Sequence, residues 1–190
     1  MDVAHCYLEG NADAVEFCPH DGYQNVLAAS TYTLKEGEQP TRAGSISLFD
    51  VNAEKGNLEL FHCVDTAGVF DIKWSPVGSS ARPLLAQADA DGYLRLYSLE
   101  GCSNEEKPRD KRAGGFLDEV SGERISSSMC LFLDWNPSAT SISVGLSDGS
   151  VSITTIAESG IEKLQEWKAH DFCFDIHQPH LMPKSDICCI

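Results

Sequence analysis

The sequence predicts an all-β fold, namely an incomplete β-propeller with about three blades and the start of a fourth. The main observation is an internal repeat, which spans residues 69–97 and again 131–153. Each copy has an apolar run that ends in tryptophan, a second apolar run, an Asp-Gly pair and a third run. Asp-Gly between alternating apolar residues is typical of a tight β-hairpin, for which we expect a two-residue type I′ turn. Units of three or four short strands that repeat in this way are typical of propeller blades.

The individual strands are predicted from runs with a period of two, in which side chains alternate between two faces. A weaker copy of the repeat forms an earlier blade, with strands expected at 14–19, 25–30 and 44–50. Its longer loop, from about Thr33 to Ala43, replaces the tight turn. The stretch 100–128 is rich in Gly, Ser and charged residues, and it predicts a surface insertion with at most one strand near Phe116-Leu117.

These repeats place blades at about 14–51, 68–120 and 129–168, followed by a truncated fourth at 169–190. Closed propellers have about four to eight blades of ~40 residues or more. We therefore interpret the 190 residues as a fragment, a truncated isoform or an incomplete ring. The first strand of a closed ring usually completes the last blade, which is absent here. We expect residues 3–8 to be unpaired or irregularly paired, beside an open apolar flank.

Composition predicts which classes of partner are absent and in which cellular compartment the chain is found. The net charge is −15, and nucleic-acid binding needs a basic surface, so we expect no nucleic-acid partner. The first residues lack the basic start and apolar core of a secretory signal, so the eight cysteines are expected to be reduced thiols in the cytoplasm. No stretch approaches the ~18 apolar residues that would span a membrane, so we expect no membrane partner. The sequence does not determine the oligomeric state.

Four residues of the repeat have roles that follow from their positions. Trp74 and Trp135 end the first strands of their blades, where we expect their rings to pack in the core against a neighbouring sheet. Asp91 and Asp148 are expected to stabilise tight turns rather than to bind a ligand. None of these four residues predicts catalysis.

His170 is the main candidate for a functional residue, since it precedes the predicted fourth blade. A histidine here commonly binds an aspartate in the tight turn of a propeller blade, so a structural role competes with catalysis or partner binding. The spacing of His170, Cys173, His177 and His180 resembles a zinc site, but it matches no standard structural set. The sequence has no nucleophile elbow, phosphate loop or zinc-protease motif, and no cofactor is expected.

Six stretches together resemble a divergent WD-repeat family, the diphthine methyl-esterases of diphthamide biosynthesis, which are often named diphthine methyltransferases. The resemblance covers about Ala14 to Phe172 and rests on Val15-Glu16-Phe17-Cys18-Pro19, Leu27-Ala28-Ala29-Ser30-Thr31-Tyr32-Thr33-Leu34, Asp65-Thr66-Ala67-Gly68-Val69-Phe70-Asp71-Ile72-Lys73-Trp74, Ala88-Asp89-Ala90-Asp91-Gly92, Leu133-Asp134-Trp135 and Trp167-Lys168-Ala169-His170-Asp171-Phe172. Thr31-Tyr32 followed by Asp65-Thr66, and the run from Trp167 to Phe172, are the more specific parts.

The resemblance implies a WD-repeat propeller that acts as a cytoplasmic hydrolase. Its substrate would be the methyl ester of diphthine on translation elongation factor 2, its protein partner. His170 is then the expected general base and Asp171 the residue that orients it, and the nucleophile stays unassigned. After Phe172 the family has an acidic residue and a tryptophan, whereas this sequence has Cys173-Phe174, so we expect impaired activity. The alternative is a non-catalytic WD-repeat scaffold that binds proteins, because a fold does not determine a function.

Overall fold

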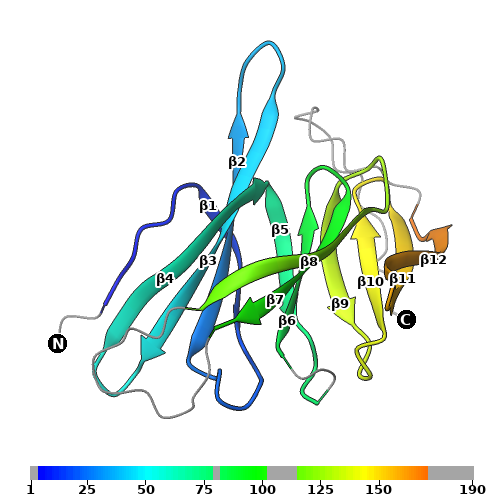
Figure 1. Cartoon of the computed structure of the whole chain (residues 1–190). Helices are drawn as coiled ribbons and strands as arrows, with labels where there is room; N and C mark the ends of the chain where they lie inside the picture. The colour runs from blue at the N-terminus through cyan, green and yellow to red at the C-terminus, as the bar shows by residue number, and fades with distance from the viewer. Residues whose placement is uncertain (1–3, 79–81, 102–114, 171–190) are drawn as a thin grey trace, which may run out of the picture.

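The computed structural model describes residues 4–78, 82–101 and 115–170, which form three antiparallel sheets of four strands each (Figure 1). Sheet 1 contains β1 (Asn11–Phe17), β2 (Val26–Lys35), β3 (Thr41–Asn52) and β4 (Asn57–Ala67). Sheet 2 contains β5 (Val69–Trp74), β6 (Leu84–Asp89), β7 (Tyr93–Glu100) and β8 (Phe116–Arg124). Sheet 3 contains β9 (Cys130–Trp135), β10 (Ser141–Leu146), β11 (Ser150–Ala157) and β12 (Gly160–Lys168). The described residues contain no helix, and the prediction of an all-β, incomplete propeller is confirmed.

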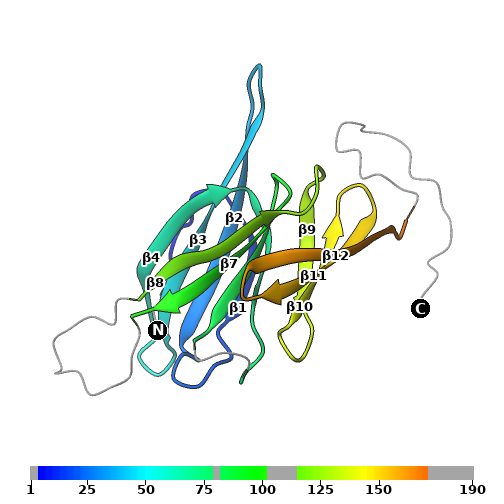
Figure 2. The same ribbon diagram turned by 45° about the vertical axis from the view of Figure 1, so that its right-hand side comes forward.

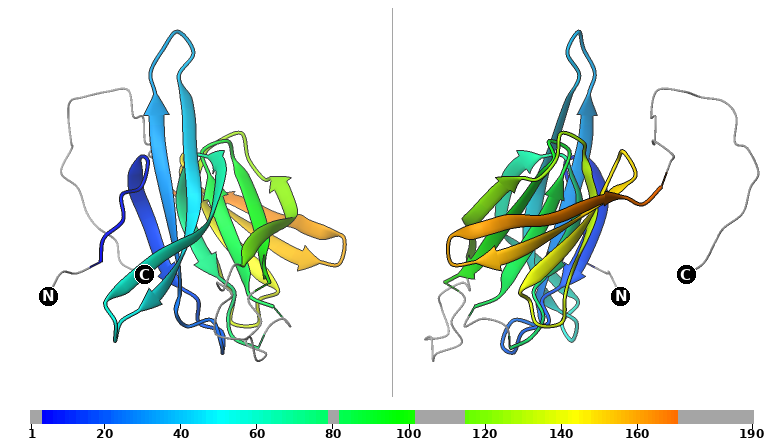
Figure 3. Two further views of the ribbon diagram at one scale, coloured as in Figure 1. Left: turned by 60° about the vertical axis from the view of Figure 1, so that its left-hand side comes forward. Right: turned by 90° about the vertical axis from the view of Figure 1, so that its right-hand side faces the viewer.

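The three sheets stack in chain order, as the two turned views in Figures 2 and 3 show. We call the face of a sheet that points to the next sheet along the chain its front face, and the opposite one its back face. Burial of apolar side chains between front and back faces stabilises the stack. Between sheets 1 and 2 the core includes Ala28, Ile46, Leu48, Ile72, Trp74, Leu85 and Tyr97. Between sheets 2 and 3 it includes Ala86, Ala88, Leu94, Leu96, Leu133, Trp135, Ile142 and Val144.

Trp74 and Trp135 join the first strands of neighbouring sheets. The indole Nε1 of Trp74 donates a hydrogen bond of 3.2 Å to the main-chain oxygen of Glu16. Trp135 makes the same contact one sheet later, with 3.1 Å from Nε1 to the oxygen of Lys73. Both rings are buried. The predicted core role of the two tryptophans is therefore confirmed, and each ring also finds a partner for its only polar group.

The two Asp-Gly hairpins have a different turn from the one expected. The N–H of Gly92 donates to the oxygen of Asp89 (3.3 Å) and that of Gly149 donates to the oxygen of Leu146 (3.0 Å), and three residues rather than two connect the paired strands. The φ angles of Gly92 and Gly149 are +82° and +84°, while neither preceding aspartate has a positive φ. The type I′ prediction is wrong, since a type I turn followed by a left-handed glycine closes the hairpin instead.

The extents of the sheets differ from the predicted repeats in two places. Sheet 1 gains β4, which lies beyond the first repeat of 14–51. The predicted loop from Thr33 to Ala43 is largely strand, because β2 and β3 stay paired as far as Lys35 and Thr41 and form the long hairpin of Figure 1. The half-exposed residues of this hairpin bury little apolar surface, so pairing with the neighbouring strand decides their structure more than their own pattern does.

The N-terminal segment agrees with its prediction as far as it is described. Residues 4–8 form no strand, and on the back face of sheet 1 the side chains of Val15 and Phe17 are exposed. In the described part of the insertion after Glu100 there is one strand, β8, which is longer than expected and completes sheet 2. Residues 171–190, which include most of the predicted fourth blade, lie outside the described residues.

Candidate functional site

His170 follows the last strand of sheet 3 and is held by its main chain. The N–H groups of Ala169 and His170 both donate to the oxygen of Gly149, each at 3.0 Å. This fixes the end of β12 to the tight turn of the same sheet. The side chain of His170 is exposed, and it borders a cavity of about 310 Å³. The other lining residues are Leu131, Phe132, Leu146, Gly149, Ser150 and Val151.

The turn beside His170 contains the carboxylate of Asp148. Its Oδ1 accepts a hydrogen bond of 2.9 Å from the N–H of Ser150, and this bond lowers the pKa of Asp148. Lys168 adds a hydrogen bond from Nζ to the main-chain oxygen of Asp148. Asp148 is therefore an anionic turn residue, as expected. In the described part of the chain, the ring of His170 makes no hydrogen bond or ion pair with it.

The other predicted site residues cannot be placed beside His170. Asp171, the expected partner of its imidazole, lies outside the described residues, as do Cys173, His177 and His180 of the zinc hypothesis. The proposed His170 and Asp171 pair therefore stays a prediction. Within the described ranges, no group of three or more potential ligand side chains could hold a metal ion. No membrane-spanning helix is found in that part of the chain either.

A polar network that the sequence reasoning missed is centred on Asp89, at the interface of sheets 1 and 2. Asp89 is completely buried, and its Oδ1 accepts hydrogen bonds from the N–H groups of Asp91 and Tyr93, each at 3.0 Å. Its Oδ2 accepts from Gln87 Nε2 and from Arg95 Nε, each at 3.2 Å. Asp89 thus stabilises the tight turn, which is the role that the sequence predicted for Asp91. A second aspartate two residues before the Asp-Gly pair was the available signal.

The network extends from Asp89 to both sheets through hydrogen-bonded side chains. Gln87 donates to the hydroxyl of Thr66 (3.0 Å) and accepts from that of Tyr97 (3.1 Å). Arg95 also binds Glu119 at 3.0 Å. Burial, with the charge of Glu119 as a smaller cause, raises the pKa of Tyr97 to about 12, so its hydroxyl stays protonated. Burial opposes the charge of Arg95, but the bond to Asp89 and the nearby carboxylates raise the pKa of Arg95 on balance.

One specific part of the family resemblance, Thr31-Tyr32 with Asp65-Thr66, lies on sheet 1 near this network. The hydroxyl of Thr31 lies 2.9 Å from that of Ser45 on the next strand, on the back face of sheet 1. The ring of Tyr32 stacks on Phe70 of sheet 2, with centroids 5.0 Å apart. Thr66 binds Gln87, as described above. The contacts of Tyr32 with Phe70 and of Thr66 with Gln87 therefore join sheets 1 and 2 at one end of their interface.

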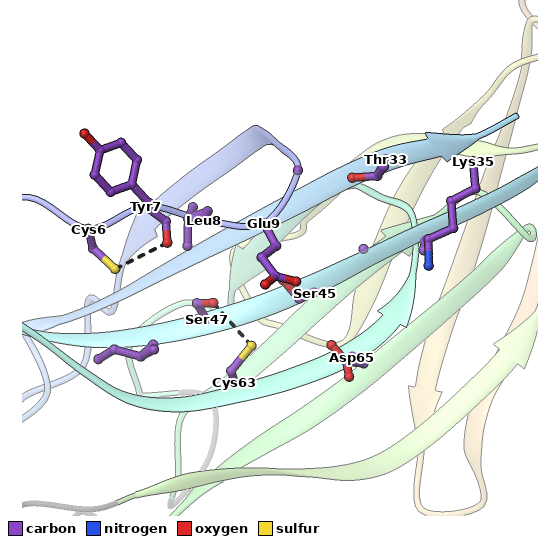
Figure 4. Close-up of a pocket in the computed structure, with 14 residues that line it drawn as sticks. Cys6, Tyr7, Leu8, Glu9, Thr33, Lys35, Ser45, Ser47, Cys63 and Asp65 are labelled. Carbon is purple, nitrogen blue, oxygen red and sulfur yellow. Dashed lines mark hydrogen bonds between the residues drawn. The ribbon is translucent and has the colours of Figure 1, made fainter.

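A second cavity, of about 410 Å³, lies between the N-terminal segment and the back face of sheet 1 (Figure 4). Its polar groups include the carboxylates of Glu9 and Asp65, and the exposed thiol of Cys63 accepts a hydrogen bond of 3.5 Å from the hydroxyl of Ser47. The lining comes from Cys6, Tyr7, Leu8, Glu9, Gly10, Thr33, Lys35, Ala43, Gly44, Ser45, Ser47, Leu60, Cys63 and Asp65. No histidine is among these lining residues (Figure 4).

Comparisons with known proteins find similarity to this chain in sequence and in fold. The chain is 30% identical to mouse diphthine methyltransferase over 187 residues, 25% identical to the human protein over 193 and 30% identical to that of Schizosaccharomyces pombe over 170. These alignments cover 86%, 86% and 87% of the chain, but only 37%, 41% and 45% of the relatives. The chain therefore spans less than half the length of the relatives it matches. No family model matches it.

Solved structures give the same architecture. Sqt1 of Chaetomium thermophilum is similar with a TM-score of 0.61 and 17% identity, over 85% of this chain and 37% of that protein. Sqt1 bound to the N-terminus of the ribosomal protein L10 is similar with a TM-score of 0.59 and 16% identity, over 85% and 38% of the two chains. At such low identity the likeness concerns the fold alone. The chain is therefore a relative of the diphthine methyltransferases by sequence, and its fold is that of an incomplete WD-repeat β-propeller.

Proposed function

We propose that the chain is part of an enzyme of diphthamide biosynthesis that hydrolyses the methyl ester of diphthine. The similarity to diphthine methyltransferases of three organisms is the observation that supports this proposal, since it extends over 86–87% of the chain. The family resemblance adds the reaction, the protein substrate, translation elongation factor 2, and the cytoplasmic location. The stacking of Tyr32 on Phe70, which come from two of the resemblance stretches, is consistent with a common structural role for those two residues.

In the proposed reaction, His170 transfers a proton from the attacking water to the leaving group. A water molecule attacks the carbonyl carbon of the ester while the imidazole accepts its proton. The tetrahedral intermediate then collapses, and the C–O bond to the methoxy group breaks. The same imidazole returns the proton to this group, which leaves as methanol, and the carboxylic acid that remains releases its proton to solvent to give the carboxylate of diphthine. The developing oxyanion requires hydrogen-bond donors, which are not assigned to residues of this chain.

We further propose that this chain has little or no activity alone. The imidazole of His170 is exposed, and the cavity beside it is bounded by sheet 3 only. A catalytic base needs rigid support on several sides and exclusion of bulk water. The main-chain bonds to Gly149 hold the backbone of His170 but not its ring.

The test is incubation of the purified chain with elongation factor 2 that carries the methyl ester of diphthine, beside a full-length mouse relative. Mass spectrometry of the modified peptide detects loss of one methylene unit when the ester is hydrolysed. We expect this loss with the full-length relative and little or none with the chain. Turnover by the chain at a comparable rate, abolished by His170→Ala, would contradict the proposed inactivity and establish His170 as catalytic.

The same experiment separates hydrolysis from methyl transfer, the reaction that the relatives' name describes. Transfer to diphthine raises the mass of the peptide, whereas hydrolysis lowers it. An increase in the presence of a methyl donor would refute the hydrolase proposal. A non-catalytic scaffold is the second candidate, and the exposed apolar side chains on the outer faces favour it. Normal diphthamide in cells that lack the full-length gene would leave only this scaffold role.

A further inference from the structure

The three sheets share one pattern of side chains on their front faces. A small residue on the second strand lies opposite a large aliphatic residue on the third strand, twice in each sheet. The pairs are Ala28 with Leu48 and Ser30 with Ile46, then Ala86 with Leu96 and Ala88 with Leu94, then Ser143 with Ile153 and Gly145 with Val151. The large residues of sheets 1 and 2 are buried under the next sheet, whereas Val151 and Ile153 of sheet 3 are only partly covered.

A carboxylate on the first strand completes the front face. Glu16 Oε2 accepts a hydrogen bond of 2.7 Å from the N–H of Trp74, on the first strand of the next sheet. Asp71, which lies two residues before the β5 position equivalent to Glu16, accepts at Oδ2 a hydrogen bond of 2.9 Å from the N–H of Leu133. On β9, Asp134 has the strand position of Glu16 and is exposed, and its Oδ1 accepts a hydrogen bond of 3.0 Å from the N–H of Trp135 on the same strand. Sheet 3 therefore offers an acceptor of the kind that joins the other sheets.

The matching back face is found at the other end of the same chain. Phe17 ends β1, just as Trp74 ends β5 and Trp135 ends β9. The two tryptophans are 5% and 8% exposed, whereas Phe17 and its neighbour Val15 are 53% and 64% exposed. The N-terminal segment covers only the part of this face near β3 and β4, where it forms the cavity of Figure 4. The part formed by β1 is thus open.

We propose that two copies of the chain associate head to tail, with the back face of sheet 1 in each copy packed on the front face of sheet 3 in the other. A second copy is the partner that the observations favour, because one chain bears both halves of the contact that already joins its own sheets. Phe17 takes the place of Trp74 and Trp135, and Asp134 accepts a main-chain N–H from β1. The described residues of two copies give six sheets, which is within the roughly four to eight blades of closed propellers.

Salt concentration provides a specific signature of this assembly. Each copy has a net charge of −15, so the two copies repel each other at low ionic strength. The proposed contact is mainly apolar, and added salt screens the repulsion without weakening burial. Association is therefore expected to strengthen as the salt concentration rises. An assembly held mainly by ion pairs would weaken instead. The dimer does not depend on the proposed enzymatic function.

The test is sedimentation velocity of the purified 190-residue chain over a range of protein and salt concentrations. We expect a species of twice the 20.7 kDa mass of one chain, with dissociation on dilution. Phe17→Ser is expected to weaken association about tenfold or more, since it removes a central aromatic contact. Phe17→Trp is expected to strengthen it, because an indole N–H can reach the main-chain oxygen of Asp134. Val120→Ser, at an exposed apolar position on β8, is the control and should change nothing.

Three results would overturn the proposal. The first is a monomer at every protein and salt concentration. The second is a dimer whose dissociation constant is unchanged in both Phe17→Ser and Phe17→Trp. The third is growth into species of unlimited mass, which would show that the heterologous contact does not close. Because Phe17→Trp adds a side chain that the equivalent strands already accommodate, its outcome does not depend on whether Phe17→Ser folds.

Discussion

Replacement of Asp89 should be among the most destabilising single changes in sheet 2. Asp89→Ala removes the acceptor for two main-chain N–H groups and for Gln87 and Arg95, at 3.0–3.2 Å. Loss of one partner of a buried ion pair costs about 3–5 kcal/mol. Arg95 keeps Glu119 and is 23% exposed, so part of its charge stays compensated. We therefore expect a loss of about 3 kcal/mol, at the lower end of that range.

The assay is urea unfolding followed by the fluorescence of the buried tryptophans. Asp89→Asn keeps an oxygen for the main-chain donors but loses the charge, so its free energy of unfolding should lie between those of the wild type and Asp89→Ala. Asp91→Ala is the matched control, since only main-chain groups of Asp91 are hydrogen-bonded in the described structure. It should cost less than about 0.5 kcal/mol. Equal destabilisation by Asp89→Ala and Asp91→Ala would refute this account of the turn.

Three further changes test the contacts between sheets and the burial of thiols. Trp135→Phe removes the indole N–H bound to Lys73 O and should lower the free energy of unfolding by about 1–3 kcal/mol in the same urea assay. Burial is the main cause of the raised pKa of Glu16. The contribution of the Glu16 carboxyl to the free energy of unfolding is therefore full below pH 4.5 and declines as pH rises through the folded pKa. Glu16→Gln should flatten this part of the plot of stability against pH. At pH 8, iodoacetamide should label the exposed Cys63 but not the buried Cys130. Burial raises the pKa of Cys130 to about 12, so its thiol stays protonated. Alkylation of Cys130 in the native protein, detected by peptide mass spectrometry, would contradict the burial.

Part of the candidate site could be predicted from the sequence. His170 was singled out, and it does lie beside a tight turn and a cavity. The network of Asp89 was missed because the partners Thr66, Gln87 and Arg95 come from three different strands. Strand pairing within sheet 2 places Arg95 beside Gln87, and the packing of sheet 1 on sheet 2 adds Thr66. A pattern search that reads one strand at a time cannot detect such a cluster.

The all-β fold and the positions of most strands were determined by the sequence itself, because period-two alternation and turn residues act over a few neighbouring positions. The core role of Trp74 and Trp135 could also be predicted from the sequence. Strand β4, the pairing of the long hairpin and the role of Asp89 depended on the tertiary structure, because pairing and burial require residues far away in the chain. Phe17 shows the difference most directly. It has the same strand position as Trp74, but it is exposed because a sheet packs on β5 and none of the described sheets packs on the back of β1.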